Sequence, residues 1–268
     1  MIGLRTGIAT GLRTGLALGI GADEIANGGG AAAWTVDGTS GIAVPANATE
    51  WTAFIAAKGL SISVPDSLWT MQQASGDAAD VIGSVPLTAA GTGISYQQTV
   101  SGWSRKAVLF TDAGSGQFKN TLNSPDISTT SQTTLIIAKV NSSAASTRNI
   151  LAQGTTSRAV LNLLSTSVIR VAIGSNTADG ATNPVGAVKP MLLQTVTGSS
   201  VTGLTDAERL SPTFTAGSGM TTCIGANNNT SPAMAVLYGL QWTGAHAEMS
   251  VANLKALLQA MGFVITWS

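Results

Sequence analysis

The stretch "AVLYGLQW", residues 235–242, is one of many short and mostly apolar runs in this chain. Segments rich in Gly, Ser, Thr, Asn and Asp separate these runs. The other runs are residues 67–71, 107–110, 134–138, 148–151, 159–163, 168–173, 191–196 and 222–225. Short apolar runs with turn-forming residues between them are typical of the strands of a β-sandwich or barrel. The sequence therefore predicts one all-β domain over residues 65–268.

A helix is expected at the end of this domain. Ser250 can cap its N-terminus, and Gly262 can end it in the left-handed conformation. The apolar residues between them are spaced so that they line one helix face. These residues are Val251, Leu254, Leu257, Leu258 and Met261. We expect this helix to pack on the edge or rim of the sandwich, with the leucines buried.

Residues 27–64 are expected to form a linker that contains a short strand at 34–36 and one amphipathic helix. Asn47 or Thr49 can cap the helix and Gly59 can end it. The spacing of Trp51, Phe54 and Ile55 places them on a single helix face. This favours a contact with the core over a binding surface.

Residues 1–26 are expected to be an extended anchoring arm. In "MIGLRTGIATGLRTGLALGIG" the even positions are aliphatic or β-branched, and the odd positions are mostly glycine or alanine. This period of two indicates an extended strand with one apolar face that docks on a neighbouring subunit. The residues expected to make these contacts are Leu4, Arg5, Ile8, Leu12, Arg13, Leu16 and Leu18. A signal peptide and a membrane helix are the alternatives, and Arg13 in the apolar centre disfavours both.

The charge of the chain is low and balanced. Charged residues make up 10% of the sequence, and the formal net charge is zero. Nothing in this balance favours nucleic acid or an acidic membrane as a partner. Cys223 is the single cysteine, which excludes an internal disulfide. Low charge suits a protein that packs against copies of itself or other proteins.

The order of these elements resembles the concanavalin A-like jelly roll of laminin-G-like and lectin-like domains. The resemblance is carried by Trp69, by "AVLFTDAGSG" (107–116), "TTLIIAKV" (133–140), "CIGANN" (223–228) and "AVLYGLQW", and by the closing helix. It implies an antiparallel jelly-roll sandwich. Families of this fold often bind sugars or proteins, sometimes through calcium, and some are glycoside hydrolases. The arm and the low charge also resemble structural proteins of tailed bacteriophages.

Sequence support for catalysis is weak. Hydrolases of this fold carry an E-x-D-x-x-E strand, and the chain has none. Asp206 and Glu208 are two residues apart, but the neighbouring Arg209 suggests a solvated loop in which alanine substitutions change little. His246 is the only histidine, which excludes a multi-histidine zinc site. We therefore expect a protein that is not an enzyme, with no catalytic residues and no required cofactor.

The turn sequences give more support to ligand binding than to catalysis. Asp112, Asn227, Asn228 and Asn229 are the candidate ligand-binding residues, and Tyr96, Trp103 and Trp242 could contact sugar unless they pack inside. Asp77, Asp80 or Asp112 could ligate calcium, although a structural role in a turn is favoured for each. No metal site is predicted.

These patterns lead to a first hypothesis: a non-enzymatic virion structural protein, on a phage capsid, tail or fibre, anchored by its arm and displaying a lectin-like domain. Its partners would be copies of itself and other virion proteins, and it would not span a membrane. The alternative is a carbohydrate-binding or adhesion module that recognises cell-surface glycan. A degenerate enzyme resembling a glycoside hydrolase is the third possibility.

Overall fold

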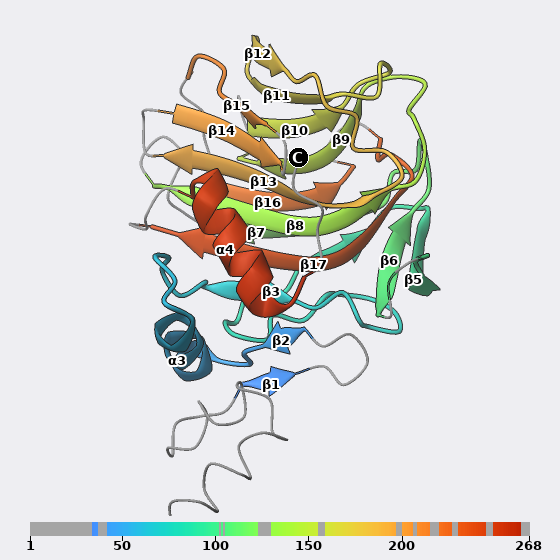
Figure 1. Cartoon of the computed structure of the whole chain (residues 1–268). Helices are drawn as coiled ribbons and strands as arrows, with labels where there is room; N and C mark the ends of the chain where they lie inside the picture. The colour runs from blue at the N-terminus through green and yellow to red at the C-terminus, as the bar shows by residue number, and fades with distance from the viewer. Residues whose placement is uncertain are drawn as a thin grey trace, which may run out of the picture.

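The computed structural model describes residues 34–36, 42–101, 103, 105–122, 130–154, 159–196, 200–205, 208–214, 220–226, 230–244 and 249–263. In these residues the chain forms two large antiparallel β-sheets, a two-stranded ribbon and two α-helices (Figure 1). The two large sheets face each other across a shared apolar core. The predicted all-β jelly-roll sandwich is therefore confirmed.

The first sheet has eight strands. Seven of them follow the order β15-β14-β13-β8-β17-β6-β5, and β3 also pairs with β17. The strands are β3 (Ser67–Trp69), β5 (Ile94–Thr99), β6 (Lys106–Phe110), β8 (Gln132–Val140), β13 (Val188–Val196), β14 (Ser200–Thr205), β15 (Arg209–Leu210) and β17 (Met234–Thr243). The longest strands, β8, β13 and β17, are adjacent and form the centre of the sheet.

The second sheet has seven strands in the order β12-β11-β10-β9-β16-β7-β4. They are β4 (Thr88–Ala90), β7 (Gln117–Leu122), β9 (Arg148–Gln153), β10 (Ala159–Leu163), β11 (Ile169–Ile173), β12 (Asn176–Asp179) and β16 (Met220–Gly225). A separate ribbon pairs β1 (Thr35–Val36) with β2 (Ala43–Val44), which confirms the short strand expected at 34–36.

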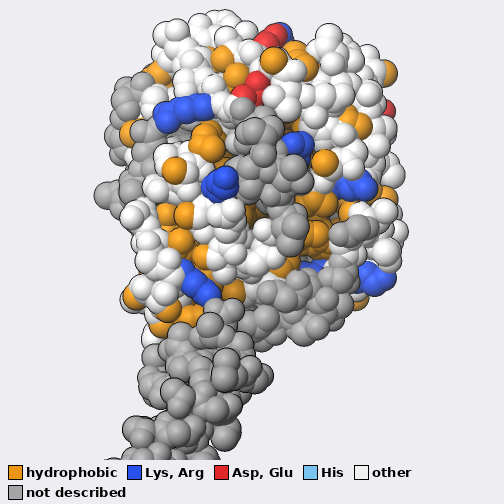
Figure 2. Space-filling view, in the orientation of Figure 1, with side chains coloured by type: hydrophobic (Ala, Val, Ile, Leu, Met, Phe, Trp, Pro, Cys, Tyr) orange, Lys and Arg blue, Asp and Glu red, His pale blue; other side chains and the backbone are white. Residues whose placement is uncertain are grey.

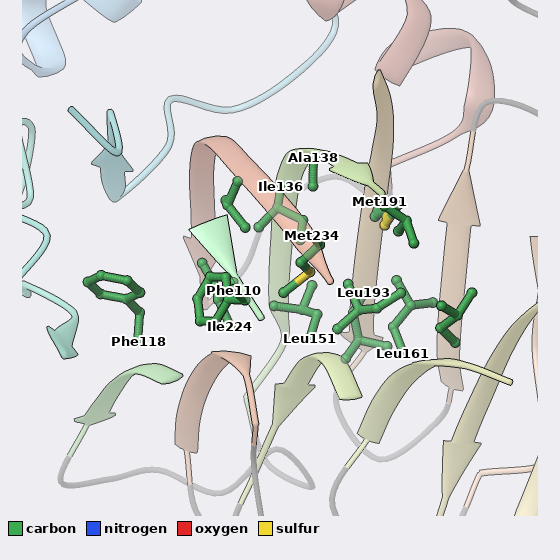
Figure 3. Close-up of a cluster of buried hydrophobic side chains, with 14 of the residues drawn as sticks. Phe110, Phe118, Ile136, Ala138, Leu151, Leu161, Met191, Leu193, Ile224 and Met234 are labelled. Carbon is green, nitrogen blue, oxygen red and sulfur yellow. The ribbon is translucent and has the colours of Figure 1, made fainter. Parts of the chain in front are cut away.

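The core of the sandwich lies between the two sheets. Phe118, Leu151, Leu161 and other residues of the seven-stranded sheet meet inward-facing residues of β6, β8, β13 and β17 (Figure 3). Phe110 and Phe118 contact each other edge to face, with ring centroids 5.9 Å apart. Successive side chains of a strand point to opposite faces, so only alternate residues of β8 and β13 reach this core.

Many of the other residues of β8, β13 and β17 are also apolar, and the C-terminal helix α4 (Val251–Met261) lies across this outer face of the sheet (Figure 1). The outer face of the eight-stranded sheet, with Leu135 and Leu192, packs in one cluster with α4 and α3 (Ala48–Lys58). Trp51 and Phe54 of α3 are fully buried in this cluster. The expected position of the closing helix at an edge is therefore wrong, because the two-sided apolar character of the central strands requires a cover over the face.

The caps of both helices are as predicted. The Asn47 and Ser250 side chains accept hydrogen bonds from the backbone N–H three residues on, and Gly59 and Gly262 are left-handed. Leu254, Leu257 and Leu258 are buried. No helix in the described residues is long and apolar enough to cross a membrane.

The expected arm falls outside the described residues. This applies to Leu4, Arg5, Ile8, Leu12, Arg13, Leu16 and Leu18, so its extended conformation and its role in assembly stay predictions. The boundaries at residues 26 and 64 also stay predictions, although Trp51 and Phe54 share a buried cluster with strands of the sandwich.

Candidate functional site

The loop that follows β6 is held on several sides at one end of the sandwich. The backbone N–H of Thr111 donates to the Gly93 carbonyl, and that of Ala113 donates to the Ser231 carbonyl. The N–H of Ala226 in turn donates to the carbonyl of Gly116. The loop is therefore fastened to the β4–β5 turn and to the segment that follows β16.

Close packing adds rigidity to this loop. A Cβ atom at Gly225, where φ is +94°, would lie 2.6 Å from the Gly116 carbonyl oxygen, and one at Gly114 would lie 2.8 Å from the Thr111 hydroxyl. Ala113 has a φ of 57°, in the left-handed region that costs a non-glycine residue about 1–2 kcal/mol. Strained residues often cluster at functional sites. This strained, immobilised loop carries Asp112 next to Ala113.

The Asp112 carboxylate forms an ion pair with Arg148 at the start of β9. Arg148 Nε donates to Asp112 Oδ1 over 3.0 Å, and Arg148 Nη1 donates to the Ser146 hydroxyl. The Arg148 side chain is only 9% exposed, whereas the Asp112 side chain is 39% exposed. In the described part of the chain, Asp112 Oδ2 accepts no hydrogen bond. The buried cation thus orients a carboxylate whose second oxygen is available to a ligand.

Two hydroxyl residues complete this end of the sandwich. The Thr230 carbonyl accepts from the Asn149 N–H over 3.0 Å, and Ser231 is bonded to the Asp112 loop through its carbonyl and its hydroxyl. The Thr230 hydroxyl oxygen is buried without a hydrogen-bond partner. We call Asp112, Ser146, Arg148, Thr230 and Ser231 the strand-end site.

The strand-end site relates directly to the predicted ligand-binding residues. Asn227, Asn228 and Asn229 lie outside the described residues, but Thr230, the next residue, is part of the site. Asp112 was a candidate from the sequence, and its role in ligand binding stays a prediction. Arg148 was not predicted, although a cation at the start of a buried apolar strand is a signal that it has a partner there.

The other candidate acidic residues have structural roles. Asp80 accepts hydrogen bonds from four backbone N–H groups, and Asp77 accepts one from Ala89. Groups of three or more His, Cys, Asp or Glu that could hold a metal ion do not occur among the described residues. Because Arg148 neutralises Asp112, the geometry gives no support to calcium at this carboxylate.

Glu208 is a third structural acid, contrary to the expected solvated loop. Its carboxylate accepts from the backbone N–H groups of Ala181 and Thr182, at 2.8 and 3.3 Å. Glu208 therefore fastens the segment after β12 to the β14–β15 hairpin, and its removal has a cost in stability. Asp206 and His246 lie outside the described residues.

The aromatic residues considered as sugar contacts each have a partner within the protein, although only Trp242 is buried. Trp242 is 3% exposed, and its Nε1 donates to the Ser63 carbonyl. Trp103 stacks on Phe263 with centroids 5.5 Å apart, and Tyr96 contacts Phe118 edge to face. The strand-end site therefore depends on polar groups.

On the side seen in Figure 2, Lys and Arg side chains are scattered among apolar and neutral polar surface. They do not gather into a single basic patch on this side, in agreement with the balanced charge of the sequence. Within the strand-end site, the Asp112 carboxylate and the Arg148 guanidinium form one ion pair.

Comparison with known proteins supports the fold. No protein-family model and no curated protein matches the sequence. Among solved structures, Trypanosoma rangeli sialidase in complex with 2,3-difluoro-KDN matches with a TM-score of 0.57 at 11% identity, covering 73% of this chain and 32% of that chain. The same enzyme with the inhibitor DANA matches with a TM-score of 0.56 at 12% identity, covering 94% and 39%.

The receptor-binding domain of botulinum neurotoxin mosaic serotype C/D also matches. The TM-score is 0.51 at 8% identity, and the match covers 73% of this chain and 50% of that chain. Identities this low show the fold alone. The chain spans about a third of the length of the sialidases that it matches.

These neighbours correct two predictions. The hypothesis of a virion structural protein is contradicted, because the matched structures are sialidases and a toxin receptor-binding domain. The expectation of a protein that is not an enzyme is contradicted as well, because sialidases are glycoside hydrolases. The chain has a β-sandwich fold that it shares with parts of such enzymes.

Proposed function

We propose that this chain is a carbohydrate-binding domain with a glycoside-hydrolase-like fold, and that its strand-end site binds the hydroxyl groups of a neutral glycan. The observation that carries this proposal is the Asp112 carboxylate, which is 39% exposed and oriented by the buried Arg148. A carboxylate oxygen without a protein partner is a strong acceptor for sugar hydroxyls, because hydrogen bonds to charged groups exceed those between neutral groups.

The groups around Asp112 suit a hydroxyl-rich ligand. Ser146 is exposed, and its hydroxyl, which accepts a hydrogen bond from Arg148 Nη1, can still donate its own hydrogen to a sugar oxygen. The close packing of the 111–116 loop removes part of the ordering cost of binding.

Charge favours a neutral sugar over an acidic one. The positive charge of Arg148 is already committed to Asp112, and the described residues of the strand-end site include no second cation to offset an anionic ligand that approaches this exposed carboxylate. Several of the matched sialidases were solved with sialic acid or related compounds, which makes sialylated glycans the natural comparison.

The test uses a glycan array that holds neutral and sialylated glycans, followed by calorimetry of the full chain with the best ligand. Asp112→Asn and Ser146→Ala should each weaken binding, with about a tenfold loss for Asp112→Asn because a charged acceptor is replaced by a neutral amide. Asp179→Asn is the matched control, since it removes another aspartate paired with an arginine, Arg170, at the far edge of the seven-stranded sheet.

Two results would contradict the proposal. One is the absence of any glycan ligand, and the other is an Asp112→Asn variant that binds as well as wild type. A separate incubation of wild type with the same glycans, followed by measurement of new reducing ends, tests whether the bound glycan is also cleaved.

A further inference from the structure

Polar side chains form two facing rows inside the sandwich, at the end opposite to the strand-end site. In the seven-stranded sheet, Thr222 of β16 is paired in register with Asn120 of β7 and with Gln153 of β9. In the eight-stranded sheet, Gln241 of β17 is paired with Thr134 of β8. Arg148 begins β9 and Gln153 ends it, so the two polar regions lie at opposite ends of the same strand.

Hydrogen bonds connect these rows across the space between the sheets. Gln132 Nε2 donates to the Thr222 hydroxyl, which donates to Gln241 Oε1 over 2.6 Å. Gln153 Nε2 donates to the Thr134 hydroxyl over 3.0 Å, and also to the Leu193 carbonyl over 2.8 Å. We call the six residues Asn120, Gln132, Thr134, Gln153, Thr222 and Gln241 the inter-sheet polar belt.

Three polar atoms of this belt are buried without a hydrogen-bond partner. They are Gln132 Oε1, Gln153 Oε1 and Asn120 Nδ2. Gln132 and Gln153 are 0% exposed, and Asn120 is 6% exposed. The carboxamide of Gln153 cannot be reversed, because the Leu193 carbonyl accepts only. That of Gln132 keeps this orientation as long as the Thr222 hydroxyl donates to Gln241.

We infer that the inter-sheet polar belt binds ordered water. The unpartnered atoms are two acceptors and one amide donor, and a single water molecule supplies two donors and accepts in return. Buried waters make about three hydrogen bonds to polar groups that otherwise have none, which is the number available here. Leaving these groups without partners would be costly in a core that is otherwise apolar.

A water molecule is favoured over a metal ion or an organic ligand for two reasons. No carboxylate belongs to the belt, and metal ions in proteins prefer charged oxygen ligands. The belt residues are at least nine-tenths buried, which leaves no exposed surface for a sugar or a peptide. The inference is independent of the proposed carbohydrate binding, because no residue is shared.

The test is water–protein cross-relaxation in the ¹⁵N-labelled full chain, measured at the side-chain amides. We expect a negative water NOE at the Asn120 side-chain amide, the sign given by water that stays bound for nanoseconds or longer. Gln132→Met replaces one acceptor with an apolar side chain of similar shape and should reduce this signal. Gln194→Met is the matched control, since Gln194 is also buried and bonded to a threonine, Thr133, on the other face of the sheet.

Absence of the NOE at Asn120 in wild type would overturn the inference, whatever the stability of the variants. An NOE that Gln132→Met leaves unchanged would overturn it as well. A crystal structure provides a second measurement. It should show a density peak within hydrogen-bonding distance of both glutamine oxygens, and an empty site or a peak at metal–ligand distance would contradict the inference.

Discussion

Replacing Asp80 should destabilise the sandwich strongly, because this one carboxylate holds a whole turn. Asp80 Oδ1 accepts from the N–H groups of Leu68, Ile82 and Gly83 at 3.0–3.1 Å, and Oδ2 accepts from Val85 at 3.2 Å. In Asp80→Ala, Gly83 can bond to water, but the N–H of the buried Leu68 loses its partner. An unsatisfied buried donor costs about 1–3 kcal/mol, and lost bonds to a charged group about 1.5–3 kcal/mol. We therefore expect a loss of about 3–5 kcal/mol.

Urea unfolding of the full chain, followed by tryptophan fluorescence, measures this loss. Trp69 is a suitable probe, because it bridges to Asp80 and its Nε1 donates to the Val85 carbonyl. Asp80→Asn keeps a neutral acceptor and should lose less than Asp80→Ala. Asp77→Ala breaks a single exposed bond and should cost within about 1 kcal/mol.

The result for Asp80 also separates a structural role from a calcium site. If backbone N–H groups are its ligands, EDTA should leave the unfolding midpoint of wild type unchanged. The reasoning is refuted if Asp80→Ala lies within about 0.5 kcal/mol of wild type, the range of ordinary surface substitutions. It is also refuted if EDTA destabilises wild type as much as the substitution does.

Two further predictions concern the edge of the sandwich. Glu208→Ala should lower the free energy of unfolding by about 1–2 kcal/mol, because the N–H groups of Ala181 and Thr182 lose a charged acceptor, and Glu208→Gln should recover part of it in the same urea assay. The pKa of Asp179 should lie below its ordinary value, because Arg170 donates hydrogen bonds to the carboxylate, and an NMR titration of Arg170→Gln should show it raised. A lowered folded-state pKa makes the pair stabilising above the unfolded-state pKa, with the effect lost as the pH falls. Since both groups are about a third or more exposed, this contribution should stay below about 1 kcal/mol and weaken in salt.

The elements that could be predicted from sequence are those with local signals. Both helices have a capping side chain, an apolar face and a terminal glycine, all within a dozen residues. The strands buried on both faces, such as β8 and β17, contain apolar runs at residues 135–138 and 234–240. By contrast β5, β7 and β12 were missed, because their sequences "ISYQQT", "QFKNTL" and "NTAD" are largely polar. Their place in a sheet depends on pairing with distant strands.

The site was only half predictable for the same reason. Asp112 lies in a turn that its own neighbours indicate, whereas Arg148 is 36 positions away in the sequence. The inter-sheet polar belt is still harder to predict from the sequence, because Gln132 and Thr222 are 90 positions apart. No local pattern reveals that their side chains meet between two sheets.

The position of β17 has a consequence for how the chain folds. This strand pairs with β3, β6 and β8, which precede it by about 100 residues or more, so it joins segments that are far apart in sequence. Pairings of such long range close large loops before they gain contacts, and chains dominated by them fold slowly. During synthesis, β3, β6 and β8 leave the ribosome before their shared partner exists. The eight-stranded sheet can therefore be completed only after residue 243 is available, and until then the apolar strands that await it are open to aggregation.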